Sequence, residues 1–524
     1  MLVNSEPPEP SEPHRPRVRK TRCCGCLLLF ALVAAALWVL WALRDRSPGY
    51  RVQLDLGGPA APGEVRGLRV GFAREAITPE VPGPGGRPVW LAGFRVGRAA
   101  TAVHDDLWAV ACVIDDGRAR VGIVALDAIG FFHDDVVAVR RRVAPELRLD
   151  YVVVASTHNH STPDLLGLWG AFPGRSGVDP AYRERVIGTC VEVLARATTA
   201  LEPAELSLRR IPLSPAGLVE DTRAPEVFDA DVRMLHFTRP GSDETVGSIV
   251  TWGDHPETAW SRNTEITADF PGYLRDALEH GLPPREPGLG GTHLFVNGAV
   301  GGLMTTSPRV AVRDPLGGGV LQEPSHEKAR ALGFSLARAV LAHVHGPWTV
   351  PRDDRPALSI RARTVALRVD NWRFLLAPAL GTIDRGHVRW RHLRSEVALL
   401  RLGEASILCV PGEVYPEIVN GGVERAPGAD FALDPVEIPP WRDAMPGKLK
   451  LVFGLANDEV GYIIPKSEWD AEPPFLYGAS TSPYGEVNSL GPDTAPTLHR
   501  AVLDLLGRRP PAGAEGVSPR PNGH

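Results

Sequence analysis

Short apolar runs alternate along residues 68–508 with longer segments whose apolar positions recur every three or four residues. The short runs predict strands and the longer segments predict helices. Alternating strands and helices favour one large α/β domain with a mixed sheet, which we place at residues 67–508. The expected strands are 107–114, 121–126, 151–155, 232–237, 247–252, 293–296, 358–367, 397–402, 406–410 and 449–453. The expected helices are 134–143, 181–201, 325–344, 413–423 and 494–506.

A different pattern precedes this domain. Residues 23–43 carry no charge and form a run of about 20 residues, which is the length needed to cross a bilayer. Five basic residues precede the run, so the positive-inside rule places the N-terminus in the cytoplasm and the domain on the exported side, periplasmic or extracellular. We therefore predict a disordered tail (1–22), a single-pass transmembrane anchor (23–43), a linker (44–66) and a second disordered tail (509–524). The alternative is a cleaved signal peptide, although no small-x-small cleavage site follows the run.

Charge and cysteine content narrow the class of protein only a little. The net charge is −5, and the folded part has no long block of one sign, so nothing indicates a nucleic-acid partner. Six scattered cysteines are too few for a disulfide framework. The chemistry must therefore be sought in other side chains.

Residues that can bind a metal follow four of the apolar strands. His158 and His160 come after 151–155, His255 after 247–252, Glu413 after 406–410, and Tyr462 shortly after 449–453. Ligands collect beyond the carboxyl ends of strands in open α/β sheets, and residues two apart in a strand point to one side. Nitrogen and oxygen ligands with room for a water suit zinc, and His160 would then be an acid/base group. The alternative is that the His-x-His pair is structural.

Several short motifs, taken in order and spacing, resemble the neutral/alkaline (non-lysosomal) ceramidase family across roughly residues 68–490. The most specific is Thr157-His158-Asn159-His160-Ser161. The others are Gly71–Thr78, His104–Ala109, His255-Pro256, Pro411-Gly412-Glu413, and Gly454–Asn457 followed by Gly461-Tyr462-Ile463. The resemblance implies that residues 67–508 form a single large mixed-sheet domain like the catalytic domain of that family.

The resemblance also implies a site. In that family, residues matching His158, His255, Glu413 and Tyr462 hold Zn²⁺, which are the same residues that the strand ends bring forward. A residue matching His160 is linked to catalysis. The resemblance further connects an arginine and a second tyrosine with catalysis, and the nearest matches are Arg223 and Tyr477.

Two departures from the family pattern bear on activity. The family carries a Ser and an Asp in a motif that matches 295–302 here, where the Ser position is Gly301 or Gly302 and the Asp position is Ala299 or Val300. A seryl intermediate is therefore not expected, whereas a zinc-activated water needs no serine. The family's C-terminal immunoglobulin-like domain also has no counterpart after residue 508.

The sequence thus predicts a zinc-dependent amidohydrolase that cleaves an amide in ceramide or a related N-acyl lipid, with the membrane as a partner through the N-terminal helix. One alternative is a non-catalytic lipid- or glycan-binding scaffold, and another is a zinc hydrolase that acts on a different amide or ester. Among the other candidates, His104 and Asp127 could support the metal ligands or form sheet-edge contacts. We expect His293 and the pair His343 and His345 to be structural.

Overall fold

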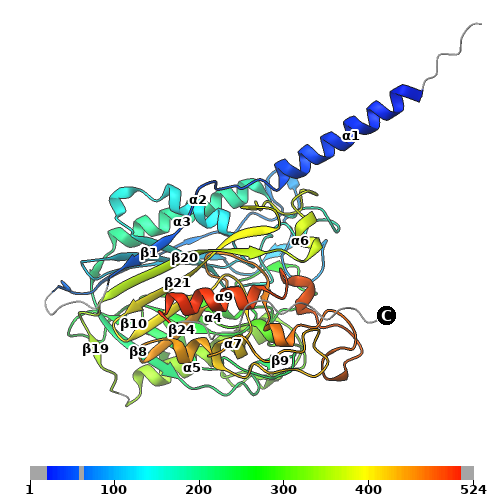
Figure 1. Cartoon of the computed structure of the whole chain (residues 1–524). Coiled ribbons are helices and arrows are strands. Elements are labelled where there is room, and N and C mark those ends of the chain that lie inside the picture. The colour runs from blue at the N-terminus through cyan, green and yellow to red at the C-terminus, as the bar shows by residue number, and fades with distance from the viewer. Residues whose placement is uncertain (1–20, 58–63, 348, 509–524) are drawn as a thin grey trace, which may run out of the picture.

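The computed structural model describes residues 21–57, 64–347 and 349–508, and three five-stranded sheets form the body of this part of the chain (Figure 1). The first sheet has the strand order β6-β5-β4-β2-β7. Its pairs are antiparallel except β5 and β6, which run parallel. Helix α3 packs across β2 and β4, beside α2. The bounds are β2 (Arg69–Ala76), β4 (Trp108–Asp115), β5 (Arg120–Leu126), α2 (His133–Arg142), β6 (Tyr151–Ser156), α3 (Pro180–Thr199) and β7 (Glu202–Pro203).

The second sheet has the order β15-β11-β10-β8-β19, and its one parallel pair is β11 and β15. Helices α4 and α5 pack against each other and cover this sheet. The bounds are β8 (Glu205–Ile211), β10 (Val232–Thr238), β11 (Thr245–Trp252), α4 (Asp269–His280), β15 (Thr292–Asn297), α5 (His326–His345) and β19 (Arg352–Asp353).

The third sheet has the order β1-β20-β21-β22-β24, with β22 and β24 parallel. Helix α9 lies across β20 and β21. The bounds are β1 (Gln53–Leu56), β20 (Leu358–Arg368), β21 (His392–Leu402), β22 (Ala405–Cys409), β24 (Leu449–Phe453) and α9 (Thr494–Leu505).

One face of each sheet contributes to a shared apolar core. Ile123 of the first sheet, Ile249 of the second and Ile407 of the third all belong to it and are almost fully buried. Helices cover the opposite faces, so inner strands such as β5 and β10 are buried on both sides, whereas the edge strands β1 and β19 are partly or fully exposed. Burial on both sides explains why the inner strands read as continuous apolar runs and not as alternating ones.

Hydrogen bonds join the carboxyl ends of strands from all three sheets. The side-chain amide of Asn297, at the end of β15, donates to the carbonyls of Thr157 (2.9 Å) and Asp254 (2.7 Å), which follow β6 and β11. The backbone N–H of Gly454, after β24, donates to the carbonyl of Asn297 (3.0 Å). The residues that follow these strands are therefore brought into one place.

Short elements fill the connections. The strands are β3 (Ala102–Val103), β9 (Glu220–Asp221), β12 (Glu265–Ile266), β13 (Gly281–Leu282), β14 (Glu286–Pro287), β16 (Met304–Thr305), β17 (Val312–Arg313), β18 (Val320–Leu321), β23 (Glu413–Val414) and β25 (Tyr462–Ile463). The α-helices are α6 (Trp372–Leu376), α7 (Pro416–Asn420) and α8 (Trp441–Ala444). The 3-10 turns are η1 (Pro84–Gly86), η2 (Pro145–Leu147), η3 (Gly301–Leu303), η4 (Lys466–Glu468), η5 (Leu476–Gly478) and η6 (Gly485–Asn488).

The structure is a mixed α/β fold, and most of the predicted strands and helices form within a few residues of their expected bounds. The predicted helix 413–423 is shorter, because Glu413 and Val414 pair with Tyr462 and Ile463 as β23 and β25 before α7 begins. Besides the short elements of the connections, the strands β2 and β8 and the helix α4 were not predicted. In addition, residues 53–56 of the predicted linker form the edge strand β1.

The prediction of a single-pass membrane anchor is wrong. A helix does form there, α1 (Thr21–Ala42), and projects from the body (Figure 1), but no helix in the described part of the chain is long and apolar enough to cross a membrane. The end of the helix is also buried on the domain at Ala42 and Leu43. The exported location inferred for the domain depended on this anchor and is withdrawn with it.

The predicted tails lie almost wholly outside the described residues, at 1–20 and 509–524, as do residues 58–63 of the predicted linker.

Candidate metal centre

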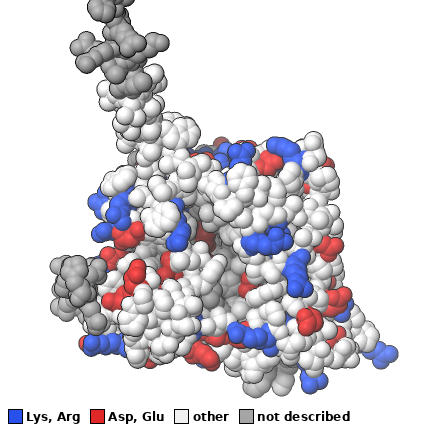
Figure 2. All heavy atoms as spheres, turned by 90° about the vertical axis from the view of Figure 1, so that its right-hand side faces the viewer, with Lys and Arg blue, Asp and Glu red and all other residues white. Residues whose placement is uncertain are grey.

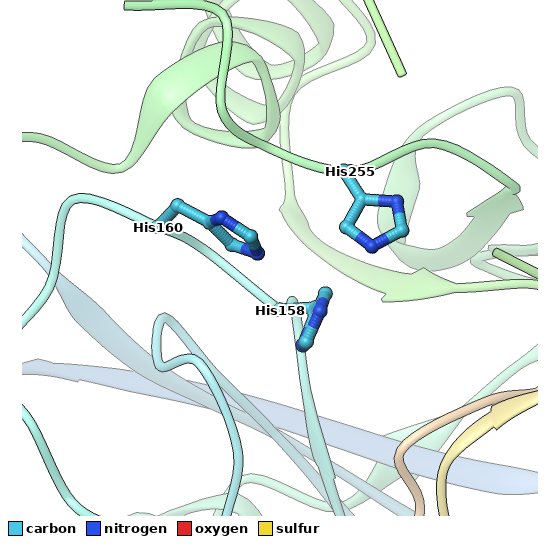
Figure 3. Close-up of side chains that lie close together, drawn as sticks. All are labelled: His158, His160 and His255. Atoms are coloured by element: carbon cyan, nitrogen blue, oxygen red, sulfur yellow. The ribbon is translucent and has the colours of Figure 1, made fainter. Parts of the chain in front are cut away.

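Three histidines from two strand ends point toward one another (Figure 3). His158 and His160 follow β6, and His255 follows β11. The ring centroid of His158 lies 5.0 Å from that of His160 and 4.9 Å from that of His255. His158 and His255 are buried, and His160 is partly buried. One ligand nitrogen from each ring lies within 4.8 Å of the others.

In His158 and in His255, the two nitrogens of the ring face different partners. Nδ1 of His158 donates to the carbonyl of Ile129 (2.7 Å), and Nδ1 of His255 donates to the carbonyl of Met304 (2.6 Å). Each Nε2 lies near the Glu413 carboxylate, and in the neutral imidazole it carries the lone pair that can bind a metal ion. Carbonyl acceptors of this kind fix the tautomer and the ring orientation of metal-binding histidines.

Glu413 completes the arrangement. One of its carboxylate oxygens, Oε2, lies 3.0 Å from Nε2 of His255 and 3.3 Å from Nε2 of His158. Burial raises the pKa of Glu413, but attraction to the two imidazoles outweighs it and leaves that pKa well below its usual range. The pKa of His158 is raised, because the pull of Glu413 exceeds the effect of burial. A cation is therefore favoured where these three groups meet.

Tyr462 lies beside Glu413 because β23 and β25 pair in parallel with these two residues in register. Its side chain is buried and lines the same cavity as the histidines. Burial and the nearby Glu413 carboxylate raise the pKa of Tyr462 well above its usual value. Two imidazole nitrogens, one carboxylate oxygen and one phenol oxygen are a donor set that zinc accepts, so the residues fit a zinc ion.

Backbone strain accompanies the placement of His158. Its φ angle is +66°, in the left-handed region that non-glycine residues adopt at a cost of roughly 1–3 kcal/mol. The next residue, Asn159, holds the loop in place, because its side-chain amide donates to the carbonyl of Thr267 (2.7 Å). The backbone N–H of His160 donates to the carbonyl of Pro256 (3.0 Å), which joins the loops after β6 and β11.

His160 faces a different carboxylate. Its Nδ1 lies 2.9 Å from Oε2 of Glu257, whose other oxygen accepts a hydrogen bond from the Thr305 hydroxyl (2.6 Å). Burial lowers the pKa of His160 to about 4, so the imidazole is neutral at pH 7 and can accept a proton. Glu257 was not among the residues predicted from the sequence, although it directly follows the His255-Pro256 motif.

A cavity that is open to solvent on one side contains the site. The face on the α6 side of the molecule is hollowed, and both uncharged and charged side chains border the hollow (Figure 2). The wall is mostly aromatic and aliphatic. It includes Phe94, Ile129, Phe132, Leu166, Leu168, Trp169, Phe374, Pro378, Ile383, Leu393, Val460, Tyr484 and Leu490. An elongated apolar group would fit this wall, with its polar end at the histidines.

Gly301 has no room for a side chain. A Cβ atom there would lie 2.3 Å from the Tyr415 ring and 2.6 Å from the backbone nitrogen of Tyr415. Tyr415 is fully buried, so it cannot move aside at low cost. The ring thus occupies the space that a serine at residue 301 would need.

The structure does not bring Arg223 or Tyr477 to the wall of this cavity. Both terminal nitrogens of Arg223 are bound, in a buried ion pair with Glu486 (2.8 and 2.9 Å) and to the carbonyl of Glu468 (2.7 Å). The hydroxyl of Tyr477 donates to Glu424, and the residue is 46% exposed. Their catalytic roles stay predictions that these contacts do not support.

The other candidates have structural partners. Asp127 accepts two hydrogen bonds from Arg275 (2.8 and 2.6 Å), and Nδ1 of His293 is 2.7 Å from the Ser248 hydroxyl. Nε2 of His345 lies 3.3 Å from the carbonyl of Pro287.

The fold can be compared with that of known proteins. No family model matches the chain, and no curated protein matches it in sequence. Among solved structures, it is similar to neutral ceramidase from Pseudomonas aeruginosa, with a TM-score of 0.61 and 17% identity over 86% of this chain and 76% of that one. It is also similar to a ceramidase complexed with C2, with a TM-score of 0.59 and 16% identity over 86% and 77% of the two chains. The described fold is therefore of the neutral ceramidase type, as the sequence motifs predicted.

Proposed function

We propose that this chain is a zinc-dependent amidohydrolase of the neutral ceramidase type, which cleaves the amide bond of ceramide or a related N-acyl lipid. The observation that carries the proposal is the convergence of His158, His255, Glu413 and Tyr462 at an apolar cavity. A site of this kind combines a cation-binding cluster with a wall suited to a hydrocarbon chain. The similarity in fold to ceramidase structures supports the choice of substrate class.

Zinc bound there would polarise the amide carbonyl and lower the pKa of a water. His160 would take a proton from the attacking water, because its imidazole is neutral and lies beside the ligand cluster. Glu257 would hold the His160 ring in the orientation that this transfer needs. The same proton can then pass to the nitrogen of the leaving amine, which departs as the neutral amine.

A lipid substrate also fits the surface beside the cavity. Phe374 lines the cavity, while Trp372 and Leu376 of the same short helix α6 are 61% and 46% exposed. Tyr484 both lines the cavity and is largely exposed. Exposed apolar groups that border a cavity are typical of a binding site for an apolar ligand.

A second candidate function is a non-catalytic lipid-binding scaffold. The observation that favours it is the ring of Tyr415, which fills the space next to Gly301 and excludes a serine nucleophile. On this reading the metal and the apolar cavity are retained, but the protein binds its lipid without cleaving it.

One experiment separates the two functions. The full chain, purified without added metal, is analysed for metal content and incubated with a series of N-acyl amides of increasing chain length. The His158→Ala/His255→Ala double variant is the control. Zinc in the wild type with release of fatty acid, both lost in the variant, is the result that the hydrolase predicts. Zinc with lipid binding but without release would favour the scaffold, and a folded wild type without zinc would overturn the hydrolase.

A further inference from the structure

A second cluster of metal-binding side chains lies apart from the first. His104, Glu265 and His326 each place one ligand atom within 4.8 Å of the others. Oε2 of Glu265 lies 2.9 Å from Nε2 of His326 and 3.9 Å from Nδ1 of His104. The rings of the two histidines are stacked, with centroids 3.7 Å apart and planes inclined by 6°.

Elements far apart in the sequence hold these side chains together. Strands β3 and β12 pair in parallel, and the backbone N–H of His104 donates to the carbonyl of Ile266 (2.8 Å), next to Glu265. His326 is the first residue of helix α5, whose start is capped by the Ser325 side chain. Nε2 of His104 lies 2.9 Å from the Tyr273 hydroxyl of α4, so the other ring nitrogen faces Glu265.

The separations suit a shared cation. Zinc binds histidine nitrogen at about 2.0–2.1 Å and carboxylate oxygen at about 2.0–2.2 Å, so tetrahedral ligands lie roughly 3.3–3.5 Å from each other. The observed 2.9 and 3.9 Å lie on either side of that value. A metal lies near the plane of a bound imidazole, so one of the stacked rings must turn toward Glu265. The His104 side chain is 35% exposed, and its Nε2 would leave the Tyr273 hydroxyl as the ring turns.

The charge nearby is also favourable. Oδ2 of Asp105 lies 3.8 Å from Nε2 of His104, at the other ring nitrogen from the one near Glu265, so a second carboxylate adds negative charge near the cluster. Two imidazoles and a carboxylate prefer a transition metal such as zinc to magnesium or calcium, which take oxygen ligands.

The segment that carries Glu265 also supports the candidate active-site loop. The carbonyl of Thr267 accepts from the Asn159 side chain (2.7 Å), and the backbone N–H of Thr267 donates to the carbonyl of Ser161 (3.2 Å). The Asn263 side chain donates to the Ser161 hydroxyl (3.0 Å) and to the Glu265 carbonyl (2.8 Å). Residues 263–267 therefore brace the loop that places His158 and His160.

We propose that His104, Glu265 and His326 form a second, structural zinc site, separate from the cluster of His158, His255 and Glu413. Zinc there fastens the β3–β12 pair to the start of α5 and stabilises the segment that braces the active-site loop. The site does not rest on the proposed hydrolase activity, because none of its ligands belongs to the first cluster.

The test uses the full-length His158→Ala/His255→Ala variant, which removes the first cluster. The protein is stripped with a chelator, and its folding is checked by circular dichroism. It is then titrated with Zn²⁺ by calorimetry and with Co²⁺ by absorption spectroscopy. We expect one equivalent of metal to bind, with the visible Co²⁺ bands typical of tetrahedral coordination, and the melting temperature to rise on binding.

Further changes in the same background identify the ligands. Addition of His326→Ala, or of the milder Glu265→Gln, should abolish or weaken binding at least about tenfold, the scale on which lost ligand interactions act. Addition of His280→Ala, at an exposed histidine of α4, should leave binding unchanged. The proposal is overturned if the folded double variant binds no zinc, or if its zinc is retained undiminished after both His326→Ala and Glu265→Gln.

Discussion

Oε2 of Glu257 lies 2.9 Å from Nδ1 of His160, and the same carboxylate accepts a hydrogen bond from Thr305. The carboxylate is buried and directly follows the loop of His255, so it joins the acid/base candidate to the ligand cluster. The contact with Glu257 would orient the His160 ring, and this positioning role of Glu257 can be measured.

The change Glu257→Gln keeps the size of the side chain and removes its charge. We expect kcat for N-acyl amide hydrolysis to fall about 10- to 100-fold with bound zinc retained, because the partner that orients His160 is weakened but no ligand is lost. Steady-state kinetics and metal analysis on the same sample measure both quantities. Glu192→Gln, at an exposed residue of α3, should leave both unchanged. Undiminished kcat in Glu257→Gln would show that the contact plays no part in the reaction.

Glu413→Gln tests the ligand cluster. The carboxylate oxygen that lies near both Nε2 atoms becomes part of a neutral amide, so we expect zinc affinity to fall by at least about tenfold and hydrolysis with it. Competition with a fluorescent chelator measures the affinity. Added zinc should restore part of the activity of this variant, and unaltered zinc affinity would contradict the assignment of Glu413 as a ligand.

Gly93 contacts the ring of His160. A Cβ atom at this position would lie 2.6 Å from the ring, so Gly93→Ala should displace His160 and lower kcat by at least about tenfold. Gly174→Ala is the matched control. Both glycines have positive φ angles, +76° and +82°, but nothing lies within 4 Å of a Cβ at Gly174. Both variants should lose about 1 kcal/mol of stability from backbone strain, and Gly93→Ala alone should lose activity. Equal activity in the two variants would rule out the predicted displacement.

Gly301→Ser should not create a productive nucleophile. The new side chain would overlap the Tyr415 ring, and we expect the free energy of unfolding to fall by about 1–3 kcal/mol or more. Urea denaturation measures the loss. Gly188→Ser, in helix α3 where a Cβ meets nothing within 4 Å, should be neutral or slightly stabilising. A Gly301→Ser variant as stable as the wild type and more active would show that Tyr415 can make room.

His293 should make the fold sensitive to acid. Burial lowers the pKa of His293 to about 4 from an ordinary value of 6.5, so between these pH values the unfolded chain binds a proton that the folded chain does not. The free energy of unfolding should therefore decrease as the pH falls from about 6.5 to 4, by up to about 3 kcal/mol from this residue.

The replacement His293→Gln removes the titrating group and keeps a polar partner for Ser248. The difference in unfolding free energy between pH 7.5 and pH 5, measured by denaturant titration, should be smaller in this variant than in the wild type. His280→Gln, at an exposed histidine, should behave as the wild type does. An identical pH dependence in His293→Gln and the wild type would refute the prediction.

The strands and the candidate metal ligands could be predicted from the sequence, because both follow from the order of apolar and polar residues along the chain. A strand buried on both faces leaves a continuous apolar run, and the run of β6 ends directly before His158. The same pattern placed His255, Glu413 and Tyr462 after apolar strands. The motifs also predicted the neutral ceramidase type of fold, which the structural similarity confirms.

Contacts between residues far apart in the sequence decided those parts of the fold and of the site that the sequence did not predict. Residues 413–414 form a strand and not a helix, because their partner is Tyr462-Ile463, almost 50 positions further along the chain. Arg223 was matched with a catalytic arginine of the family, but its guanidinium forms a buried ion pair with Glu486. The length of the apolar N-terminal run suggested a membrane span, whereas the end of its helix is buried on the domain.

The sequence alone determined which side chains stand at strand ends, since that follows from the order of apolar and polar residues. Only the tertiary structure decided which of these strand ends meet, how Glu257 faces His160, and that His104, Glu265 and His326 share one place. The physical reason is that contacts between residues far apart in the sequence depend on how the three sheets pack around their shared core, and no local pattern encodes that packing.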